Sequence, residues 1–163
     1  FGFEVFVMPP ICLNQDPISS SAIRKLLAAG DVELASKYLG RWPEFCGQVV
    51  HGKGMGRGLG YPTANLLIGS EMQLPLPGVY FGRGQVDGRS HDAVVNIGSK
   101  PTLGGTDLSF EVHLLDFSGN LYGKYLTVCL KKRLRDEKRF DSVEELSRQI
   151  ARDIESVSAL RQS

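Results

Sequence analysis

A glycine-rich segment is the first part of the chain whose residue types could do chemistry. In HGKGMGRGLGYPTAN, residues 51–65, glycine recurs at every second position and alternates with residues that include Lys53 and Arg57; the glycines are Gly52, Gly54, Gly56, Gly58 and Gly60. Backbone without Cβ atoms can bring its N–H groups close to phosphate oxygens. Neither G-x-x-x-x-G-K-[ST] nor G-x-G-x-x-G occurs here, so a flexible hairpin loop is the alternative interpretation.

The end of this segment adds a hydroxyl and a carboxamide. Pro62 makes a rigid turn, and Thr63 and Asn65 follow two residues apart, on the same side of the strand expected after the turn. A hydroxyl beside a phosphate loop is the group with which P-loop enzymes hold Mg²⁺. The alternative is that Thr63 is an ordinary strand residue and Asn65 a turn residue.

A carboxylate lies inside an otherwise apolar segment, SFEVHLL, residues 109–115. In a strand, Phe110, Val112 and Leu114 would point one way, and Glu111 and His113 the other. The pattern alone leaves Glu111 either on a solvated face or as a buried functional group. His113 is interpreted as a structural histidine rather than a base.

Short strands separated by Gly-rich turns are expected from residue 45 to about 135. The candidate strands are 45–51, 64–68, 78–86, 91–97, 108–117 and 124–134, with hairpin turns at Asp87-Gly88 and Ser118-Gly119-Asn120. Six strands with tight links and no helices between them predict a mainly β fold, an antiparallel sheet closed into a six-stranded barrel.

Helices are expected on both sides of this barrel. Residues 19–40 predict a short helical hairpin, with Ser19 and Ser20 as caps and Gly30 and Gly40 as stops. Residues 142–157 predict a long C-terminal helix that begins with a Ser142/Glu145 capping box and packs an apolar stripe on the barrel. The opening FGFEVFVMPP predicts a strand that leads into a Pro-Pro turn, and we expect it to continue from a longer protein.

Composition restricts the classes of function. The 163 residues carry 19 Lys and Arg against 18 Asp and Glu, so charge gives no argument for non-specific binding to nucleic acid or membrane. Three widely spaced cysteines, Cys12, Cys46 and Cys129, are expected to be reduced thiols rather than zinc ligands. With no spanning segment and no signal segment in the sequence, we expect a cytoplasmic protein.

A basic run at residues 131–139, KKRLRDEKR, leaves a rival interpretation open. Such a run is usually a solvated strand end, and sometimes a nucleic-acid patch. A small barrel that binds single strands needs several aromatic side chains on one face. The aromatic residues are scattered over separate strands instead, at Phe45, Tyr80, Phe110 and Tyr125, so we expect no nucleic-acid partner.

Five segments in this order resemble riboflavin kinases over residues 45–156: GKGMGRGLGYPTANL, GVYFGRG, VVNIGSKPTLGG, FEVHLLDFSGNLYGKYLTV and LRDEKRFDSVEELSRQIARDI. The resemblance implies that the chain converts ATP and riboflavin to ADP and FMN. It implies ATP phosphates at the glycine loop and Pro62, a divalent cation (Mg²⁺, or else Mn²⁺ or Zn²⁺) on Thr63 and Asn65, and Glu111 as the catalytic base. It also implies flavin contacts at Arg135 and Phe140, between the barrel mouth and the last helix. A non-catalytic flavin-binding module is the alternative.

Residues 1–40 resemble the end of the FMN adenylyltransferase domain of bacterial bifunctional FAD synthetases, through PISSSAIRKLLAAGDVELASKYLGR. In that family the I-S-S-x-x-I-R stretch binds nucleotide phosphates at a helix N-terminus. The H-x-G-H motif of that domain is absent from this sequence. We therefore expect two parts, an adenylyltransferase remnant at 1–40 that continues an upstream domain and a kinase domain at 41–163, and no FAD synthesis by this chain.

Overall fold

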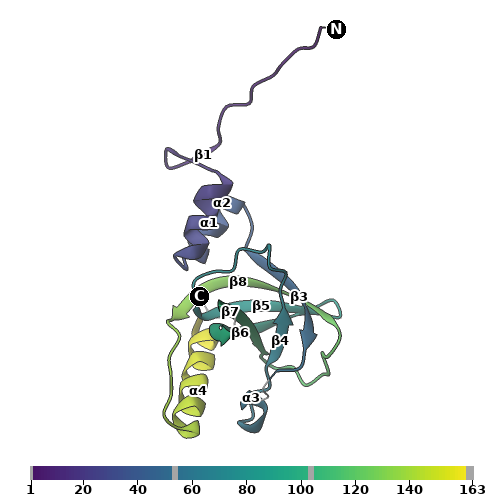
Figure 1. Cartoon of the computed structure of the whole chain (residues 1–163), viewed down its shortest axis with the longest axis vertical. Helices are drawn as coiled ribbons and strands as arrows, with labels where there is room; N and C mark the ends of the chain where they lie inside the picture. The colour runs from purple at the N-terminus through teal and green to yellow at the C-terminus, as the bar shows by residue number, and fades with distance from the viewer. Residues whose placement is uncertain (1, 53–54, 103–104, 161–163) are drawn as a thin grey trace.

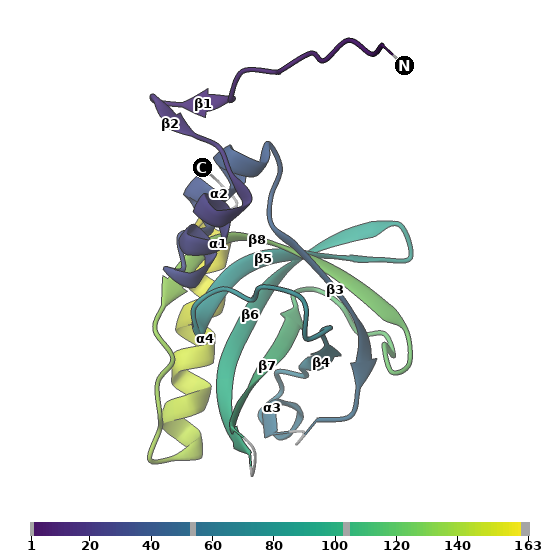
Figure 2. The same cartoon turned by 45° about the horizontal axis from the view of Figure 1, so that its top comes forward.

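Six antiparallel strands close into a barrel in the computed structural model, which describes residues 2–52, 55–102 and 105–160. The strands are β3 (Glu44–Val50), β4 (Ala64–Leu67), β5 (Gly78–Val86), β6 (Arg89–Thr102), β7 (Gly105–Leu114) and β8 (Tyr125–Arg135). Their order around the barrel is β3-β4-β7-β6-β5-β8 (Figures 1 and 2). The predicted mainly β, closed six-stranded architecture is confirmed.

One of the two predicted hairpin turns is confirmed. Val86 pairs with Arg89, and the two residues between them, Asp87 and Gly88, have φ angles of 47° and 77°. Positive φ at both central positions is the geometry of a type I′ turn, whose twist matches that of the strands it joins. The β5–β6 hairpin therefore forms where the Asp-Gly pair predicts it.

The second predicted hairpin turn, at Ser118-Gly119-Asn120, is wrong. β7 pairs with β4 and β6, and β8 pairs with β3 and β5, so β7 and β8 are not neighbours. β7 also ends at Leu114 rather than at 117, just before Asp116, whose φ of 56° breaks the extended backbone. Residues 115–124 form a loop between two strands whose edges are both occupied by other strands.

The barrel interior is filled by alternate residues of each strand. On β7 the buried side chains are Phe110, Val112 and Leu114, and Glu111 and His113 face outward, as the alternation predicts. Phe45, Tyr80 and Phe110 are at most 2% exposed, so three of the four aromatic residues considered for base stacking lie in the core. This arrangement argues against the single-strand-binding alternative.

The predicted helical hairpin forms and packs on one end of the barrel (Figure 1). It consists of α1 (Ser20–Ala28), which Ser19 caps by accepting from the Ala22 N–H at 3.2 Å, and α2 (Val32–Leu39), which ends at left-handed Gly40. Its side chains Leu27, Val32 and Ala35 join the same buried cluster as the barrel interior. The Leu76 N–H also donates to the Leu27 carbonyl at 3.0 Å.

A polar contact lies beneath the hairpin. Tyr80 is fully buried, and its hydroxyl donates to the Leu76 carbonyl. Burial raises the pKa of this phenol. The Arg133 side chain crosses the Tyr80 ring at 5.9 Å, and its stem lies so close to Gly30, between the two helices, that a Cβ there would be 2.7 Å from Arg133 Cδ. The hairpin and the barrel therefore meet over a tightly packed surface.

The C-terminal helix α4 (Val143–Leu160) runs along the outside of the barrel (Figure 2). Ser142 caps it by accepting from the Glu145 N–H at 3.2 Å, as the capping box predicts, whereas the Glu145 carboxylate reaches the Asp141 N–H rather than that of Ser142. The apolar stripe has two roles. Ile154 and Val157 pack on Val79, Phe81 and Val94 of the barrel, and the first half of the stripe faces a pocket.

The N-terminal segment differs from the prediction. In the described part of the chain, residues 2–10 form no strand, because no neighbouring segment supplies a ladder for them. The only ladder there joins β1 (Cys12–Leu13) to β2 (Asp16–Pro17). All three cysteines are free thiols, and Cys12 and Cys46 are exposed. No helix of the described residues is long and apolar enough to cross a membrane.

Because the helical hairpin and the barrel share one core, we expect a substitution in the hairpin to lower the stability of the whole chain. Leu27→Ala should lower the free energy of unfolding of the whole chain by about 3 kcal/mol, because it leaves a cavity between the hairpin and the barrel. Denaturant unfolding followed by the fluorescence of the single tryptophan, Trp42, and by circular dichroism should show one coincident, shifted transition. An unchanged barrel transition would show that the hairpin folds independently.

Candidate active site

A row of polar side chains crosses the outer face of the barrel. Asn65 of β4 pairs with Glu111 of β7, and Glu111 pairs with Asn96 of β6. Paired residues in a sheet point to the same face, and the neighbours of these three in sequence are buried inside the barrel. The three polar groups are half-buried, so they form a continuous strip at the surface.

Glu111 and Asn96 of this strip line a pocket of about 570 Å³ between the barrel and the start of α4, here called the helix pocket, whereas Asn65 does not line it. On the barrel side it is lined by Thr63, Asn96, Glu111 and His113. The opposite side combines the apolar side chains of Phe140, Val143, Leu146 and Ile150 with the polar residues Lys138, Asp141 and Ser142. A pocket that offers both apolar and polar side chains suits a flat aromatic ligand that carries a polar chain.

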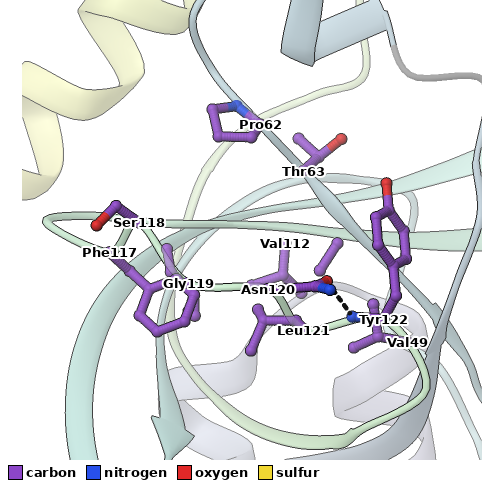
Figure 3. A pocket seen from close by; sticks show the side chains of 12 residues that line it. Val49, Pro62, Thr63, Val112, Phe117, Ser118, Gly119, Asn120, Leu121 and Tyr122 are labelled. Carbon is purple, nitrogen blue, oxygen red and sulfur yellow. Dashed lines mark hydrogen bonds between the residues drawn. The ribbon is translucent and has the colours of Figure 1, made fainter.

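A second pocket of about 440 Å³, here called the loop pocket, lies on the other side of Thr63 (Figure 3). It is bounded by Val49, Pro62 and Val112 and by the loop from Phe117 to Tyr122. The Asn120 side chain accepts from the Tyr122 N–H at 3.1 Å, and the Tyr122 ring stacks on His51 at 4.0 Å. Thr63 lines both pockets, so this residue lies where they meet.

The glycine loop contains a single helical turn, α3 (Met55–Gly58), between β3 and β4. Two of its glycines closely approach other groups. A Cβ on Gly56 would lie 2.4 Å from the Tyr61 carbonyl oxygen of the backbone, and a Cβ on Gly52 would lie 2.1 Å from the Asn65 amide nitrogen, so the Asn65 side chain would have to move. Gly60 has a φ of 83°, in the left-handed region that favours glycine. Lys53 and Gly54 lie outside the described residues, as does the side chain of Arg57.

The groups around Thr63 are suited to a hard cation. Thr63 and Asn65 lie two residues apart, and Asn65 is the register partner of Glu111, so a hydroxyl, an amide oxygen and a carboxylate gather at one end of β4. Oxygen ligands are those that Mg²⁺ and Mn²⁺ take, with water and phosphate oxygens completing the shell. Because the Asn65 carboxamide fills the space above Gly52, its position depends on the missing Cβ there.

Arg135 and Phe140, predicted as flavin contacts, both line the helix pocket. The Arg135 guanidinium is committed to protein partners. It forms a two-pronged salt bridge to Asp153 of α4, at 2.9 and 2.7 Å, and donates to the Asp136 carbonyl at 2.9 Å. Gln149 donates to the same carboxylate at 3.0 Å. Arg135 therefore fastens α4 to the barrel, and its contact with a flavin stays a prediction.

Sequence reasoning missed several residues of the site. Asn96, Asp153 and the loop from Phe117 to Tyr122 were not identified as lining residues. Asn96 is a single polar residue between buried Val95 and Ile97, and this alternation was a usable signal for an outward-facing group. Asp153 and the loop gave no such signal, because their roles depend on contacts distant in sequence.

Comparison with known proteins points to one family. The family model Flavokinase, described as riboflavin kinase, matches residues 39–161. A bifunctional riboflavin kinase/FMN adenylyltransferase of Pseudomonas fluorescens is 42% identical over 98% of this chain and 51% of that protein. Those of Escherichia coli K12 and Bacillus subtilis are 40% and 41% identical over 94% and 83% of this chain and 49% and 44% of theirs.

Solved structures share the fold. A crystal structure described as a macrolide-efflux protein from Streptococcus pneumoniae has a TM-score of 0.88 and 36% identity, over 93% of this chain and 50% of that one. Riboflavin kinase from Trypanosoma brucei has a TM-score of 0.54 and 25% identity, over 74% and 80%. The chain belongs to the riboflavin kinase family, and it spans about half the length of the bifunctional relatives that it matches.

The salt bridge to α4 makes a prediction about the pocket wall. The Asp153 side chain is 6% exposed. Asp153→Ala should therefore leave the Arg135 guanidinium without its carboxylate partner and lower the free energy of unfolding by about 3 kcal/mol. Glu155→Ala, at an exposed position on the same helix, should change it by less than about 0.5 kcal/mol. Equal effects of the two variants in urea unfolding would contradict the role given to this pair.

Proposed function

We propose that this chain is a riboflavin kinase, which transfers the γ-phosphoryl group of ATP to the ribityl 5′-hydroxyl of riboflavin and releases FMN and ADP. The observation that carries this proposal is that Thr63 and Glu111, which are distant in the sequence, line one pocket, and that Asn65, two residues after Thr63, is the register partner of Glu111. Membership of the riboflavin kinase family supports the choice of vitamin as the acceptor.

The two pockets suit the two substrates. The helix pocket, with the apolar side chains of Phe140, Leu146 and Ile150 facing Glu111, suits the isoalloxazine ring with its ribityl chain directed at the carboxylate. The loop pocket opens at Thr63 and at the base of the glycine loop, which suits a nucleotide whose phosphates run toward Thr63. Both substrates would then present their reacting atoms at the junction of the pockets.

A divalent cation bound to the phosphates would neutralise charge that builds up during the transfer. Thr63 and Asn65 are the residues proposed to hold it, by a hydroxyl and an amide oxygen. The family implies such a metal, and oxygen ligands favour Mg²⁺ or Mn²⁺ over Zn²⁺.

The proposed chemistry needs little covalent work from the protein. Glu111 accepts the proton of the ribityl 5′-hydroxyl while the oxygen of that hydroxyl bonds to the γ-phosphorus. The bond between the γ-phosphorus and the β–γ bridging oxygen breaks, and ADP leaves. N–H groups of the glycine loop, at Gly52, Gly56, Gly58 and Gly60, would donate to the phosphates, together with Lys53 and Arg57. Positioning and charge neutralisation supply most of the rate.

We also propose that this chain is part of a longer enzyme. The bifunctional relatives and the resemblance of residues 1–40 support an upstream adenylyltransferase domain that continues into the helical hairpin. A domain boundary near residue 40 is compatible with the family match that starts at 39. The packing of α1 and α2 on the barrel core means that this remnant would also contribute to the stability of the kinase domain.

The central test is a coupled assay for riboflavin-dependent ADP formation, with wild type and Glu111→Gln. The wild type should form ADP only when riboflavin and a divalent cation are both present. Glu111→Gln should lower kcat by about 10²- to 10⁴-fold, the usual contribution of a general base, with the Kd for riboflavin changed less than about twofold. A Glu111→Gln enzyme with normal turnover would refute the base assignment, and an inactive wild type that still binds riboflavin would favour the non-catalytic alternative.

A second substitution tests the cation site. Thr63→Ala removes the hydroxyl between the pockets and should raise the Mg²⁺ concentration needed for half-maximal activity by about tenfold, because one oxygen ligand is lost. Thr63→Ser keeps the hydroxyl and should stay close to wild type. Titration of Mg²⁺ at saturating ATP and riboflavin measures both. An identical Mg²⁺ dependence in the Ala variant would exclude Thr63 as a ligand.

A further inference from the structure

His113 lies where the pairing of β4 with β7 stops. The ladder runs through Leu66↔Phe110, Asn65↔Glu111 and Ala64↔Val112, and one more step in the same register sets Thr63 opposite His113. Pro62, the next residue toward the glycine loop, has no N–H to donate to β7. The backbone ladder therefore cannot hold this end of β4, although Thr63 is the residue that must be held.

A side-chain bond takes the place of the missing ladder. Nδ1 of His113 lies 2.9 Å from the carbonyl oxygen of Pro62. A carbonyl oxygen only accepts hydrogen bonds, so Nδ1 carries the proton and donates it. This assigns the Nδ1–H tautomer to the neutral ring.

The bond acts on the peptide group that orients Thr63. The Pro62 carbonyl and the Thr63 nitrogen belong to one planar unit, so fixing the direction of the carbonyl also fixes the direction in which the chain enters Thr63. Thr63 is the one of these residues that lines both the helix pocket and the loop pocket. A rotation of this peptide plane would carry the hydroxyl away from the junction.

His113 also connects the glycine loop to β7. The rings of Tyr61 and His113 meet edge to face, at a centroid distance of 5.8 Å and an interplanar angle of 88°. The Tyr61 N–H donates to the Gly56 carbonyl at 2.8 Å, which ties Tyr61 to the turn α3. His113 lies on β7, the strand that carries Glu111, and through these contacts it joins β7 to the turn before Thr63 and to the end of the glycine loop.

We propose that His113 is a positioning residue for the metal–nucleotide site: its Nδ1–H holds the Pro62 carbonyl and so sets the Thr63 hydroxyl at the junction of the two pockets. The inference rests on the proposed function in that the ligand at Thr63 is taken to be a divalent cation with its nucleotide. His113 is given no proton-transfer role, because that role is assigned to Glu111.

The test compares His113→Leu with His113→Asn. Asparagine has a donor nitrogen two bonds from Cβ, as Nδ1 is in histidine, so it can keep the bond to Pro62, whereas leucine cannot. His113→Leu should weaken the binding of ADP with Mg²⁺, measured by calorimetry, by about three- to tenfold, the effect of one hydrogen bond. His113→Asn should recover to within about twofold of wild type. Because His113 also lines the helix pocket, the Kd for riboflavin, measured by flavin fluorescence, is compared in both variants.

A double-substitution cycle separates action through Thr63 from a general effect. In a Thr63→Ala background, His113→Leu should add less than about twofold to the loss of Mg²⁺-ADP affinity, because its target is already gone. Thermal unfolding of each variant identifies any that is misfolded, in which case the comparison of the Asn variant with wild type decides. Additive losses would overturn the proposal, and so would a loss of riboflavin binding with unchanged Mg²⁺-ADP binding.

The experiments distinguish a failure of the kinase assignment from a failure of the positioning role of His113. A wild type that binds Mg²⁺-ADP but forms no ADP in the presence of riboflavin would contradict the kinase assignment, while the binding measurements on the His113 variants would still decide the positioning role. A wild type that binds no Mg²⁺-ADP would contradict both.

Discussion

The register between β4 and β7 is the constraint on which the site depends. Leu66, Phe110 and Val112 must face the barrel interior, and this requirement places Asn65 and Glu111 opposite each other on the outside. A slip by one residue would turn every side chain of β4 to the other face. The same apolar contacts that close the barrel therefore set the distance between the proposed cation ligands and the proposed base.

The place where the pairing of β4 with β7 ends, at Pro62 and Thr63, is as important as the paired residues. Pro62 interrupts the ladder at the position where two pockets meet, and a histidine side chain supplies the bond that the backbone cannot. A glycine loop is joined at this point to a rigid strand, so a segment able to approach phosphates closely is connected to groups held in fixed positions. Such an arrangement is suited to a reaction that depends on placing two substrates rather than on covalent chemistry.

The second wall of the site has a separate origin. α4 lies against the barrel through Val157 and Ile154 at one end and through the Arg135–Asp153 salt bridge nearer the pocket. The first turns of α4 face the polar strip across the helix pocket. The apolar stripe of this helix therefore contributes to the core at one end and to the pocket at the other. At the far end of the barrel the helical hairpin closes the core, so the folding unit includes residues that the family resemblance assigns to another domain.

Local patterns were sufficient for the barrel strands and the long helices, although residues 2–10, predicted as a strand, form none. Two-residue alternation and the Asp87-Gly88 turn predicted the strands, caps and stops predicted the helices, and the residues around Thr63 and Glu111 were marked as candidates by their types. The sequence by itself left two interpretations of Glu111, and it misassigned the 115–124 connection as a hairpin because it does not specify which strands become neighbours. Strand order, the polar strip with Asn96, the salt bridge to Asp153 and the contact between His113 and Pro62 were decided only by the tertiary structure. These contacts join residues far apart in the chain, and they follow from the closure of the barrel, which no local pattern encodes.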